Sequence, residues 1–210
     1  MGLFSSINNK YNFRWRSGAL LLCFIAVLLF SCTQKKYANP RIEIETKYGV
    51  IVAELYPSKA PQTFAAILSY VDSGFYEDAS FYRVLNVTNQ PSNAPKTEIL
   101  QGGLWKTNYM KLYEMKGIPH EPTSKTGLNH TDGVLSLARN VPGTANAEFF
   151  ICIGNQPGLD EGGENVEDKL GYAAFGKVIK GMSVVRKIYM LNDHEQMLTP
   201  PVAIYNITRK

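Results

Sequence analysis

The sequence has little cysteine: three residues in 210, with no Cys-x-x-Cys pair. So few cysteines cannot build a disulfide framework, and without the paired spacing a structural zinc site is not expected. Histidine is equally scarce, and His120, His130 and His194 lack the spacing of metal ligands. We therefore expect no metal and no cofactor. Cys152 lies in an apolar segment and is expected to fill the core.

Excess charge of one sign is also missing. The net charge is +4, charged residues make up 19% and hydrophobic residues 45% of the chain. This ordinary balance excludes wholesale disorder, and the length suits one domain. Nothing in the sequence resembles the interleaved basic and aromatic patch of a nucleic-acid-binding protein, so we expect no nucleic-acid partner.

The chain lacks an apolar run long enough to cross a bilayer as a helix, which takes roughly 20 residues. Its longest run, Ala19–Phe30, has twelve residues. Lys10, Arg14 and Arg16 precede the run, and no acidic residue occurs among the first thirty-one. This pattern is typical of a secretory signal, so we predict that residues 1–31 are a signal peptide.

The segment Leu29-Phe30-Ser31-Cys32 resembles the lipobox of bacterial lipoproteins. The resemblance implies that Cys32 is lipidated and that the protein lies in the bacterial cell envelope, anchored to a membrane on its extracytoplasmic side. Ordinary cleavage with a soluble product and an uncleaved anchor are the alternatives. Polar residues end in proline at Pro40, so we predict a tether over 32–40 and a folded domain over 41–210.

Short apolar runs dominate the predicted domain. Ile42 and Ile44 alternate with glutamates, which predicts a first strand. Further strands are predicted over residues 50–55, 80–85, 98–101, 133–138, 148–153, 174–179 and 202–208. A helix follows Pro61, and a second covers 182–191, because apolar residues recur on one face of each. The pattern is mainly β and predicts one closed barrel with two helices over its ends.

Three segments carry candidate chemistry. Phe81-Tyr82-Arg83-Val84 places one arginine in an apolar strand, so Arg83 is either paired structurally or presented to a ligand. Gln101-Gly102-Gly103 ends a strand with an amide and allows close backbone approach. Phe149 and Phe150 must point to opposite faces, so one fills the core and the other is free to line a pocket.

Two long loops interrupt the strands. Residues 86–97 form a polar loop that contains proline, and residues 160–169 are rich in acidic side chains. The second loop lacks the alternating ligands of a calcium loop. We expect both loops to be solvated.

The order of these segments resembles the cyclophilin family of peptidyl-prolyl cis–trans isomerases across essentially all of residues 41–210. The resemblance implies the family's closed eight-stranded antiparallel barrel, capped by two α-helices, and an enzyme that isomerises X-Pro bonds in proline-containing polypeptides and so assists folding. We expect a monomer. The segments on which the resemblance to this family rests are Lys47-Tyr48-Gly49, Pro57–Phe64, Gly74-Phe75-Tyr76, Ser80–Leu85, Gln101-Gly102-Gly103, Gly133–Ala138, Glu148–Ile151 and Ala174–Val178.

The resemblance also assigns site residues. Arg83 matches the catalytic arginine, Gln101 a glutamine that holds the peptide backbone, and Phe150 the floor of the proline pocket. The residues expected to contact substrate beside them are Ile99, Ala138, Glu148, Leu159 and Tyr172.

Four positions depart from the family pattern. Glu98 stands in place of a phenylalanine, Gly158 of a tryptophan in many eukaryotic members, and Tyr172 of a histidine. Glu148 replaces a glutamine and is expected to pair with Arg83 and partly quench it. The alternative function is therefore a catalytically weak proline-peptide-binding or scaffolding lipoprotein, in which Glu148→Gln would raise activity.

Overall fold

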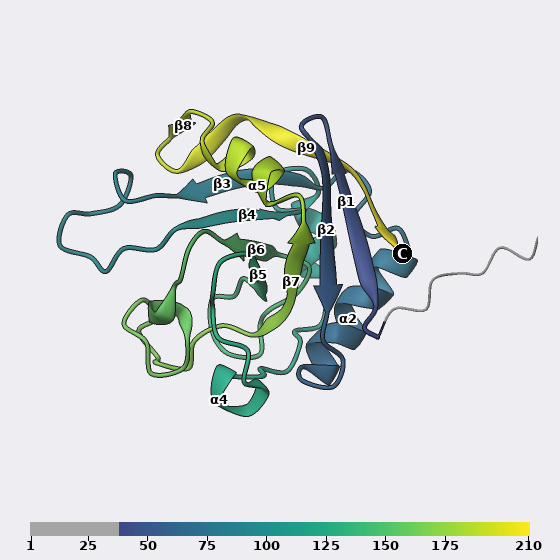
Figure 1. Cartoon of the computed structure of the whole chain (residues 1–210), viewed down its shortest axis with the longest axis horizontal. Helices are drawn as coiled ribbons and strands as arrows, with labels where there is room; N and C mark the ends of the chain where they lie inside the picture. Colours follow the sequence, from purple (N-terminus) through teal and green to yellow (C-terminus); the bar gives the residue numbers. More distant parts are fainter. Residues whose placement is uncertain (1–37) are drawn as a thin grey trace, which may run out of the picture. The chain divides into compact units, whose positions relative to one another are not determined.

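The structure, a computed structural model, describes residues 38–210. The predicted signal peptide, residues 1–31, and the predicted lipidation site Cys32 lie outside the described residues. Strands account for most of the regular structure (Figure 1). They are β1 Arg41–Thr46, β2 Gly49–Leu55, β3 Ser80–Leu85, β4 Ile99–Gly103, β5 Val134–Leu137, β6 Phe149–Cys152, β7 Ala174–Lys180, β8 Asp193–His194 and β9 Met197–Arg209.

Eight of these strands close into a barrel. Their order is β1-β2-β7-β5-β6-β4-β3-β9, and β9 pairs back to β1. The pairings around the ring are all antiparallel. The two-residue β8 lies outside the ring and forms a hairpin with the start of β9. The predicted closed eight-stranded barrel is therefore confirmed, and closure removes the exposed edges that an open sheet would leave.

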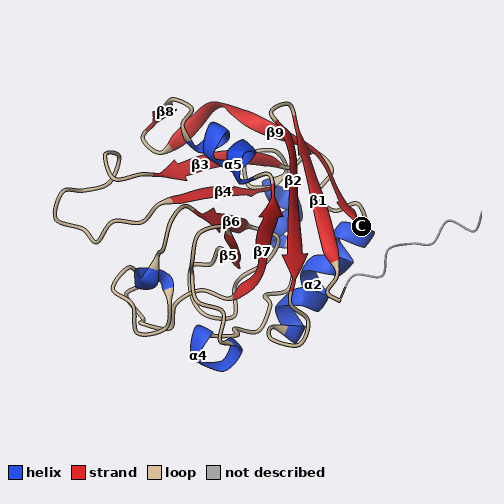
Figure 2. Ribbon diagram, viewed as in Figure 1, coloured by secondary structure: helices blue, strands red, loops and turns tan. Residues whose placement is uncertain are grey.

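Two substantial helices cap the barrel, as the sequence predicts. Helix α2, Pro61–Asp72, packs against β9, and α5, Met182–Tyr189, packs against β2 and β4. They lie at opposite ends of the barrel (Figures 1 and 2). The prediction of two helices was incomplete, because the described chain also holds short helices, which span too few residues to show a helical period. These are α3 Tyr109–Tyr113, α4 Thr123–Thr126 and the 3₁₀ turn Pro157–Leu159.

The barrel interior holds a continuous apolar core. Fully buried side chains come from most strands and from α2, among them Ile44, Leu55, Ile67, Leu100 and Phe175. Cys152 is also fully buried in this core, as expected.

Strand β6 confirms the expected division of its two phenylalanines. Phe149 points into the core, where its ring packs edge-on against Tyr76 and Phe81, with centroids 5.9 Å away in both cases. Phe150 points to the other face and lines a cleft.

Strand β3 contains a bulge that controls the site. Phe81 pairs with Gly102 of β4, but Arg83 pairs with Gln101, so Tyr82 is an extra residue in the ladder. A bulge of this kind suspends the alternation of side chains across a strand. As a result, Tyr82 and Arg83 both line the cleft, although they are neighbours in sequence.

Within residues 38–210, no helix is both long and apolar enough to span a membrane.

Candidate functional site

One cleft of about 910 Å³ on the outside of the barrel brings the predicted site residues together. The candidate catalytic side chains Arg83, Gln101 and Phe150 all line it. So do the predicted contact residues Ile99, Ala138, Glu148, Leu159 and Tyr172. Other lining residues carried no signal in the sequence, chiefly Tyr82, Trp105, Leu112, Asn146 and Met197.

Amide oxygens hold the Arg83 side chain. Its Nη1 donates to Gln101 Oε1 at 3.2 Å, while Nε and Nη2 both donate to Gln196 Oε1, at 3.1 and 2.6 Å. No ion pair to Arg83 occurs among the residues that the structure describes. The guanidinium is thus fixed in place by neutral groups and keeps its positive charge.

The expected pairing of Glu148 with Arg83 is wrong. The Glu148 carboxylate is buried and accepts hydrogen bonds from Tyr82 Oη at 2.7 Å and from the backbone N–H groups of Leu104 and Trp105 at 2.6 and 3.1 Å. The bulge explains this arrangement, because it places the Tyr82 hydroxyl next to the carboxylate. Glu148 is satisfied by these donors and does not quench the arginine.

A directed chain of hydrogen bonds runs from Glu148 to Arg83. A carboxylate only accepts, so Tyr82 must donate its proton to Glu148. The Tyr82 oxygen can then accept from Gln101 Nε2, at 2.7 Å, which leaves Gln101 Oε1 to face the guanidinium. Glu148 therefore sets the orientation of the Gln101 amide through Tyr82.

The electrostatics of this chain follow from burial. Burial raises the pKa of Glu148 above its ordinary value, although the hydrogen bonds from Tyr82 and the two backbone amides counteract the shift. Burial also raises the pKa of the Tyr82 hydroxyl, and the neighbouring Glu148 charge adds to this effect. The hydroxyl therefore stays protonated and keeps its role as donor.

Gly103 makes room for the carboxylate. A Cβ atom at this position would lie 2.2 Å from Glu148 Oε1, which is far inside van der Waals contact. The backbone φ of Gly103 is also +147°, a conformation that glycine adopts most readily. The second glycine of the Gln-Gly-Gly segment thus lets the buried carboxylate reach the strand end.

We predict that Glu148→Gln lowers kcat/KM about fivefold for the X-Pro isomerisation that the family resemblance leads us to expect, the worth of roughly one hydrogen bond. The new amide keeps its oxygen on the two backbone N–H groups and turns its NH₂ toward Tyr82. The Tyr82 hydroxyl then loses its acceptor. If Gln101 turns its amide so that Oε1 accepts from this hydroxyl, the Gln101 NH₂ faces the Arg83 guanidinium, and two donors oppose each other. Steady-state kinetics on a proline peptide measures the effect.

The matched control for this substitution is Glu98→Gln. Glu98 does not line the cleft, contrary to the position expected from the phenylalanine it replaces, because its carboxylate accepts from Tyr189 Oη at 2.6 Å on α5. Glu98→Gln should leave kcat/KM unchanged. A rise in kcat/KM for Glu148→Gln would contradict the orienting role and restore the quenching hypothesis.

Phe150 forms an apolar floor that is braced on two sides. The His130 ring stacks on it with centroids 6.0 Å apart and planes at 21°, and the Tyr172 ring meets it edge-on at 5.3 Å. Phe150 is 2% exposed. Such packing leaves the ring little freedom to move, so the floor keeps its shape.

Behind Phe150, His130 links Asp160 to Ser136. His130 Nδ1 lies 2.6 Å from Asp160 Oδ1, and Nε2 lies 3.0 Å from Ser136 Oγ. Burial lowers the pKa of His130, although the hydrogen bond and charge of Asp160 oppose the shift. The ring is therefore neutral, donates from Nδ1 and accepts at Nε2. Ser136 is completely buried, so this arrangement supports the floor and offers no accessible nucleophile.

The lowered pKa of His130 predicts acid sensitivity. As the pH falls through about 6.5, the unfolded chain takes up a proton on this histidine, whereas the folded chain takes it up only at a lower pH. The free energy of unfolding should therefore decrease from pH 7 towards pH 5, and His130→Gln should reduce that slope. Denaturant titrations across this range measure it, with exposed His194→Gln as the matched control. Equal slopes for the parent and His130→Gln would contradict the prediction.

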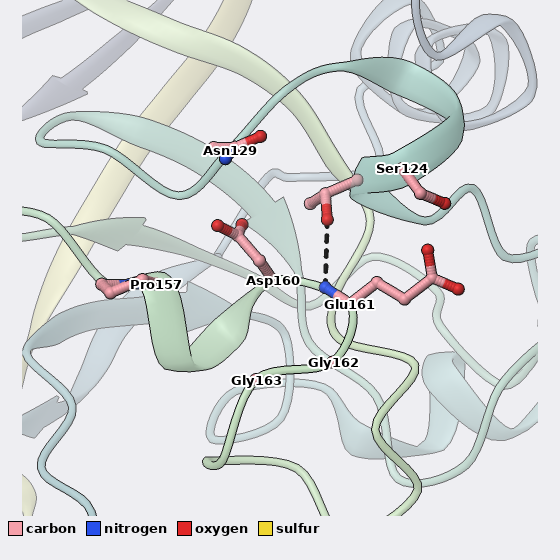
Figure 3. A pocket seen from close by; sticks show the side chains of 8 residues that line it. Ser124, Asn129, Pro157, Asp160, Glu161, Gly162 and Gly163 are labelled. Carbon is pink, nitrogen blue, oxygen red and sulfur yellow. Dashed lines mark hydrogen bonds between the residues drawn. The ribbon is translucent and has the colours of Figure 1, made fainter.

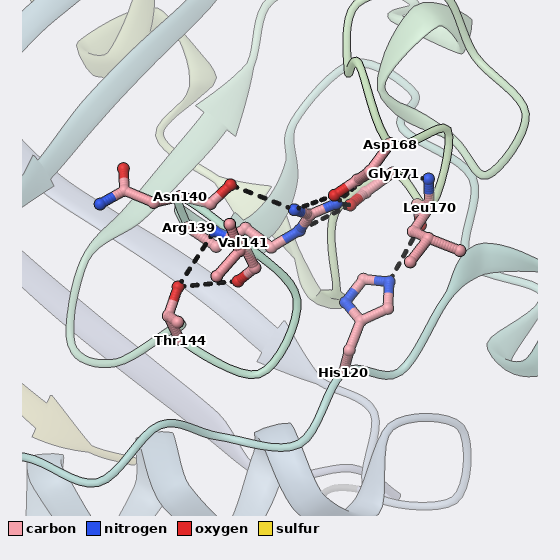
Figure 4. Close-up of polar contacts among 8 residues, drawn as sticks. All are labelled: His120, Arg139, Asn140, Val141, Thr144, Asp168, Leu170 and Gly171. Atoms are coloured by element: carbon pink, nitrogen blue, oxygen red, sulfur yellow. Dashed lines mark hydrogen bonds and ion pairs between the residues drawn. The ribbon is translucent and has the colours of Figure 1, made fainter.

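Arg139 is held by Asp168 and Gly171 (Figure 4), next to Tyr172 of the cleft. Its guanidinium binds Asp168 through two hydrogen bonds of 2.7 and 2.9 Å, and it also donates to the Gly171 carbonyl. The guanidinium lies 5.3 Å from the centre of the Tyr172 ring. The Arg139 hydrogen bond lowers the pKa of Asp168 to about 2. The sequence analysis missed these contacts of Arg139.

The acidic loop 160–169 is largely exposed, as expected, but several of its side chains make defined contacts. Asp160 contacts His130 and Asp168 contacts Arg139, as described above. The Asn165 side chain donates to the Lys96 carbonyl and to the Thr97 hydroxyl, both in the loop 86–97. The two long loops thus meet at one side of the cleft. Gly158 permits this contact, because a Cβ there would lie 2.2 Å from Asn165 Oδ1.

A second hollow of about 470 Å³ shares no lining residue with the cleft (Figure 3). It lies between α4 and the start of the acidic loop, where the Glu161 N–H donates to Thr123 Oγ1 at 3.0 Å. Nowhere in residues 38–210 do three His, Cys, Asp or Glu side chains gather as a metal site requires.

The chain resembles known proteins over most of its length. The family model described as cyclophilin type peptidyl-prolyl cis-trans isomerase/CLD matches residues 41–209. A peptidyl-prolyl cis-trans isomerase of Acinetobacter baylyi is 34% identical over 179 residues, covering 82% of this chain and 87% of the relative. Peptidyl-prolyl cis-trans isomerase B of Escherichia coli is 32% identical over 148 residues, covering 70% and 82%.

Solved structures show the same fold. A crystal structure of a Cryptosporidium parvum cyclophilin type peptidyl-prolyl cis-trans isomerase superposes with a TM-score of 0.63 at 22% identity, over 82% of this chain and 98% of that one. A second structure of that protein, in the presence of the dipeptide Ala-Pro, gives a TM-score of 0.61 and covers 81% of this chain and 98% of that one.

Proposed function

The chain belongs to the family of cyclophilin-type peptidyl-prolyl cis-trans isomerases, and we propose that it isomerises X-Pro bonds of proteins outside the cytoplasm, with Arg83 as its catalytic residue. One observation supports Arg83 as the catalytic residue. Amide oxygens hold its guanidinium in place beside the apolar floor made by Phe150, and no carboxylate among the described residues pairs with it.

Rotation about an X-Pro bond crosses a barrier of roughly 18–20 kcal/mol, because the twisted amide loses its resonance. In the twisted state the proline nitrogen becomes pyramidal and regains a lone pair. Arginine has five N–H donors, of which Gln101 and Gln196 occupy three. One N–H on each terminal nitrogen remains for the substrate, and a donor that binds the nitrogen lone pair stabilises the twisted state more than either planar state.

The apolar side of the cleft holds the proline ring while the preceding carbonyl rotates. Phe150 is its floor, and Ile99 and Leu159 are buried at its edges. Ala138 keeps the wall small, and Tyr172 closes the side next to Phe150. In this assignment Gln101 contacts the peptide backbone while it also holds Arg83, and Glu148 orients Gln101.

The binding or scaffolding alternative loses its main support. It relied on a quenched Arg83, but Glu148 contacts Tyr82 and two backbone amides, and Glu98 contacts α5. Of the two remaining departures, Gly158 accommodates Asn165, and Tyr172 packs edge-on against Phe150.

The proposed location rests on the amino-terminal sequence. A basic stretch, a twelve-residue apolar run and the lipobox-like Leu29-Phe30-Ser31-Cys32 support secretion and lipidation of Cys32. Several acyl chains on one cysteine would give stable anchoring, because one chain alone binds membranes marginally. The clients are then unfolded or folding polypeptides of the cell envelope.

Isomerisation is tested with the purified full chain in detergent micelles and a short Ala-Pro peptide. Exchange between the cis and trans peptide, followed by NMR, should accelerate in proportion to protein concentration. A chain that binds the peptide without accelerating exchange would refute the proposed activity and support the binding alternative.

The anchor is tested separately with Cys32→Ser in a bacterial host. The parent should fractionate with membranes and carry acyl chains on Cys32 by mass spectrometry, whereas the variant should leave the membrane fraction. Cys23→Ser, which alters a cysteine within the predicted signal peptide, is the control. Equal membrane association of the parent and Cys32→Ser would overturn lipidation at this position.

A further inference from the structure

Gln196 lies behind Arg83, in the turn between β8 and β9. Its Oε1 accepts two of the three hydrogen bonds that hold the guanidinium, at 3.1 and 2.6 Å. Gln196 does not line the cleft, whereas Arg83 does. Gln196 therefore acts on a substrate in the cleft indirectly, and its side-chain hydrogen bonds to Arg83 provide the route.

The orientation of the Gln196 amide is determined by its surroundings. Its Nε2 donates to the Asn89 carbonyl at 3.2 Å, so the amide oxygen must face Arg83. The backbone is held as well, because its N–H donates to Asp193 Oδ2 at 2.9 Å and its carbonyl accepts from Val84 N at 2.8 Å.

Asp193 also binds the loop that follows β3. Its carboxylate accepts from the side-chain amides of Asn86 at 3.3 Å and Asn89 at 3.0 Å. The hairpin β8–β9 and the loop 86–97 thus form one hydrogen-bonded support behind the guanidinium. This gives the loop 86–97 a role that its polar composition did not suggest.

The backbone at Gln196 disfavours a residue with a side chain. Its φ is +72°, and that of the preceding Glu195 is +49°, in the left-handed region where glycine and asparagine are favoured. A long side chain at such a position costs stability in the turn. Backbone strain of this kind is retained where the side chain makes a functional interaction, and here Gln196 Oε1 binds Arg83.

We propose that Gln196 is a positioning residue for isomerisation, which holds the Arg83 guanidinium in its productive orientation. This inference rests on the proposed function of Arg83. Gln101 holds one side of the guanidinium and Gln196 the other. Losing Gln196 frees Nε and one terminal nitrogen and allows the side chain to rotate about its last bonds.

The test compares the full-length parent with Gln196→Gly. Glycine suits the left-handed backbone, so the variant should melt at or above the parental temperature. Its kcat/KM on a short Ala-Pro peptide should fall about tenfold, mainly through kcat, because misplacement of a catalytic group raises the barrier. Glu195→Gly, one residue earlier in the same turn, is the matched control and should keep parental kinetics.

Two further measurements separate positioning from a general structural role. In an Arg83→Ala background, Gln196→Gly should have no further effect on kcat/KM, since the group that it positions is gone. The ¹⁵Nε resonance of Arg83 should shift and its N–H should exchange faster with water in Gln196→Gly. This NMR readout remains valid if the parent proves inactive, so failure of the proposed function and failure of this inference are distinguishable.

Unchanged kinetics in Gln196→Gly with an unshifted Arg83 resonance would overturn the inference. The inference would also be overturned if Gln196→Gly lowered kcat/KM equally in the Arg83 and Arg83→Ala backgrounds, or if its loss of kcat/KM were accompanied by a lower melting temperature.

Discussion

Arg83→Ala is expected to lower kcat/KM for X-Pro isomerisation roughly a hundredfold or more, the range measured when a preorganised transition-state donor is removed. The loss should lie mainly in kcat, because the guanidinium contacts the twisted amide more strongly than the planar one. Arg83 is half-buried at the cleft and forms no ion pair within the described chain, so the melting temperature should change little. Exchange kinetics on a short Ala-Pro peptide provides the measurement.

Arg83→Lys is the informative companion variant. Lysine keeps the charge but lacks the planar fork that binds Gln101 and Gln196 simultaneously. We expect it to lose most of the activity as well, which would show that orientation matters in addition to charge. If Arg83→Ala retained more than half of the parental kcat/KM, the catalytic role of this residue would be refuted.

Phe150→Ala is expected to have the largest effect on stability. The ring is 2% exposed and stacks between His130 and Tyr172, so its removal leaves a cavity that these neighbours cannot fill without moving. A truncation of this kind costs about 3–5 kcal/mol, which corresponds to a fall in melting temperature of about 10 °C for a domain of this size. KM for proline peptides should rise, because the floor of the pocket is lost.

Phe150→Leu separates the two effects. Leucine restores much of the volume and stability but presents no flat ring to the proline. We therefore expect the free energy of unfolding to fall by no more than about 2 kcal/mol, together with a raised KM. Calorimetry and steady-state kinetics on the same preparation test this. A parental KM in Phe150→Leu would show that only the volume of this side chain matters.

Local sequence patterns were sufficient to predict the strands. Alternation at Ile42 and Ile44 predicted β1, and the helical period of Ile67, Leu68 and Val71 predicted α2. These patterns are informative because one face of each element is buried, and burial selects apolar side chains at a fixed period. The short α3 and α4 and the two-residue β8 escaped prediction because they contain less than two periods of any pattern.

Eight of the residues that line the cleft were predictable from motif resemblance, but the other lining residues and the hydrogen bonds between them were not. Glu148 was expected to contact Arg83 and instead contacts Tyr82, because the bulge at Tyr82 brings two consecutive side chains to one face. Nothing in Phe81-Tyr82-Arg83-Val84 marks a bulge, since the extra residue becomes visible only when β3 is paired with β4.

By itself, therefore, the sequence determined the strands of the barrel through burial at a regular spacing, and the resemblance of its short motifs to a family identified eight of the side chains that line the cleft. Only the tertiary structure decided what each polar group binds. Arg83 and Gln196 are 113 residues apart in the chain, and the pairing of β3 with β9, in which Arg83 lies opposite Met197, brings them together. Whether a hydrogen bond forms depends on differences of a fraction of an ångström in the donor–acceptor distance and on the direction of the donor. Sequence spacing carries no information on either quantity once the partners lie on different strands.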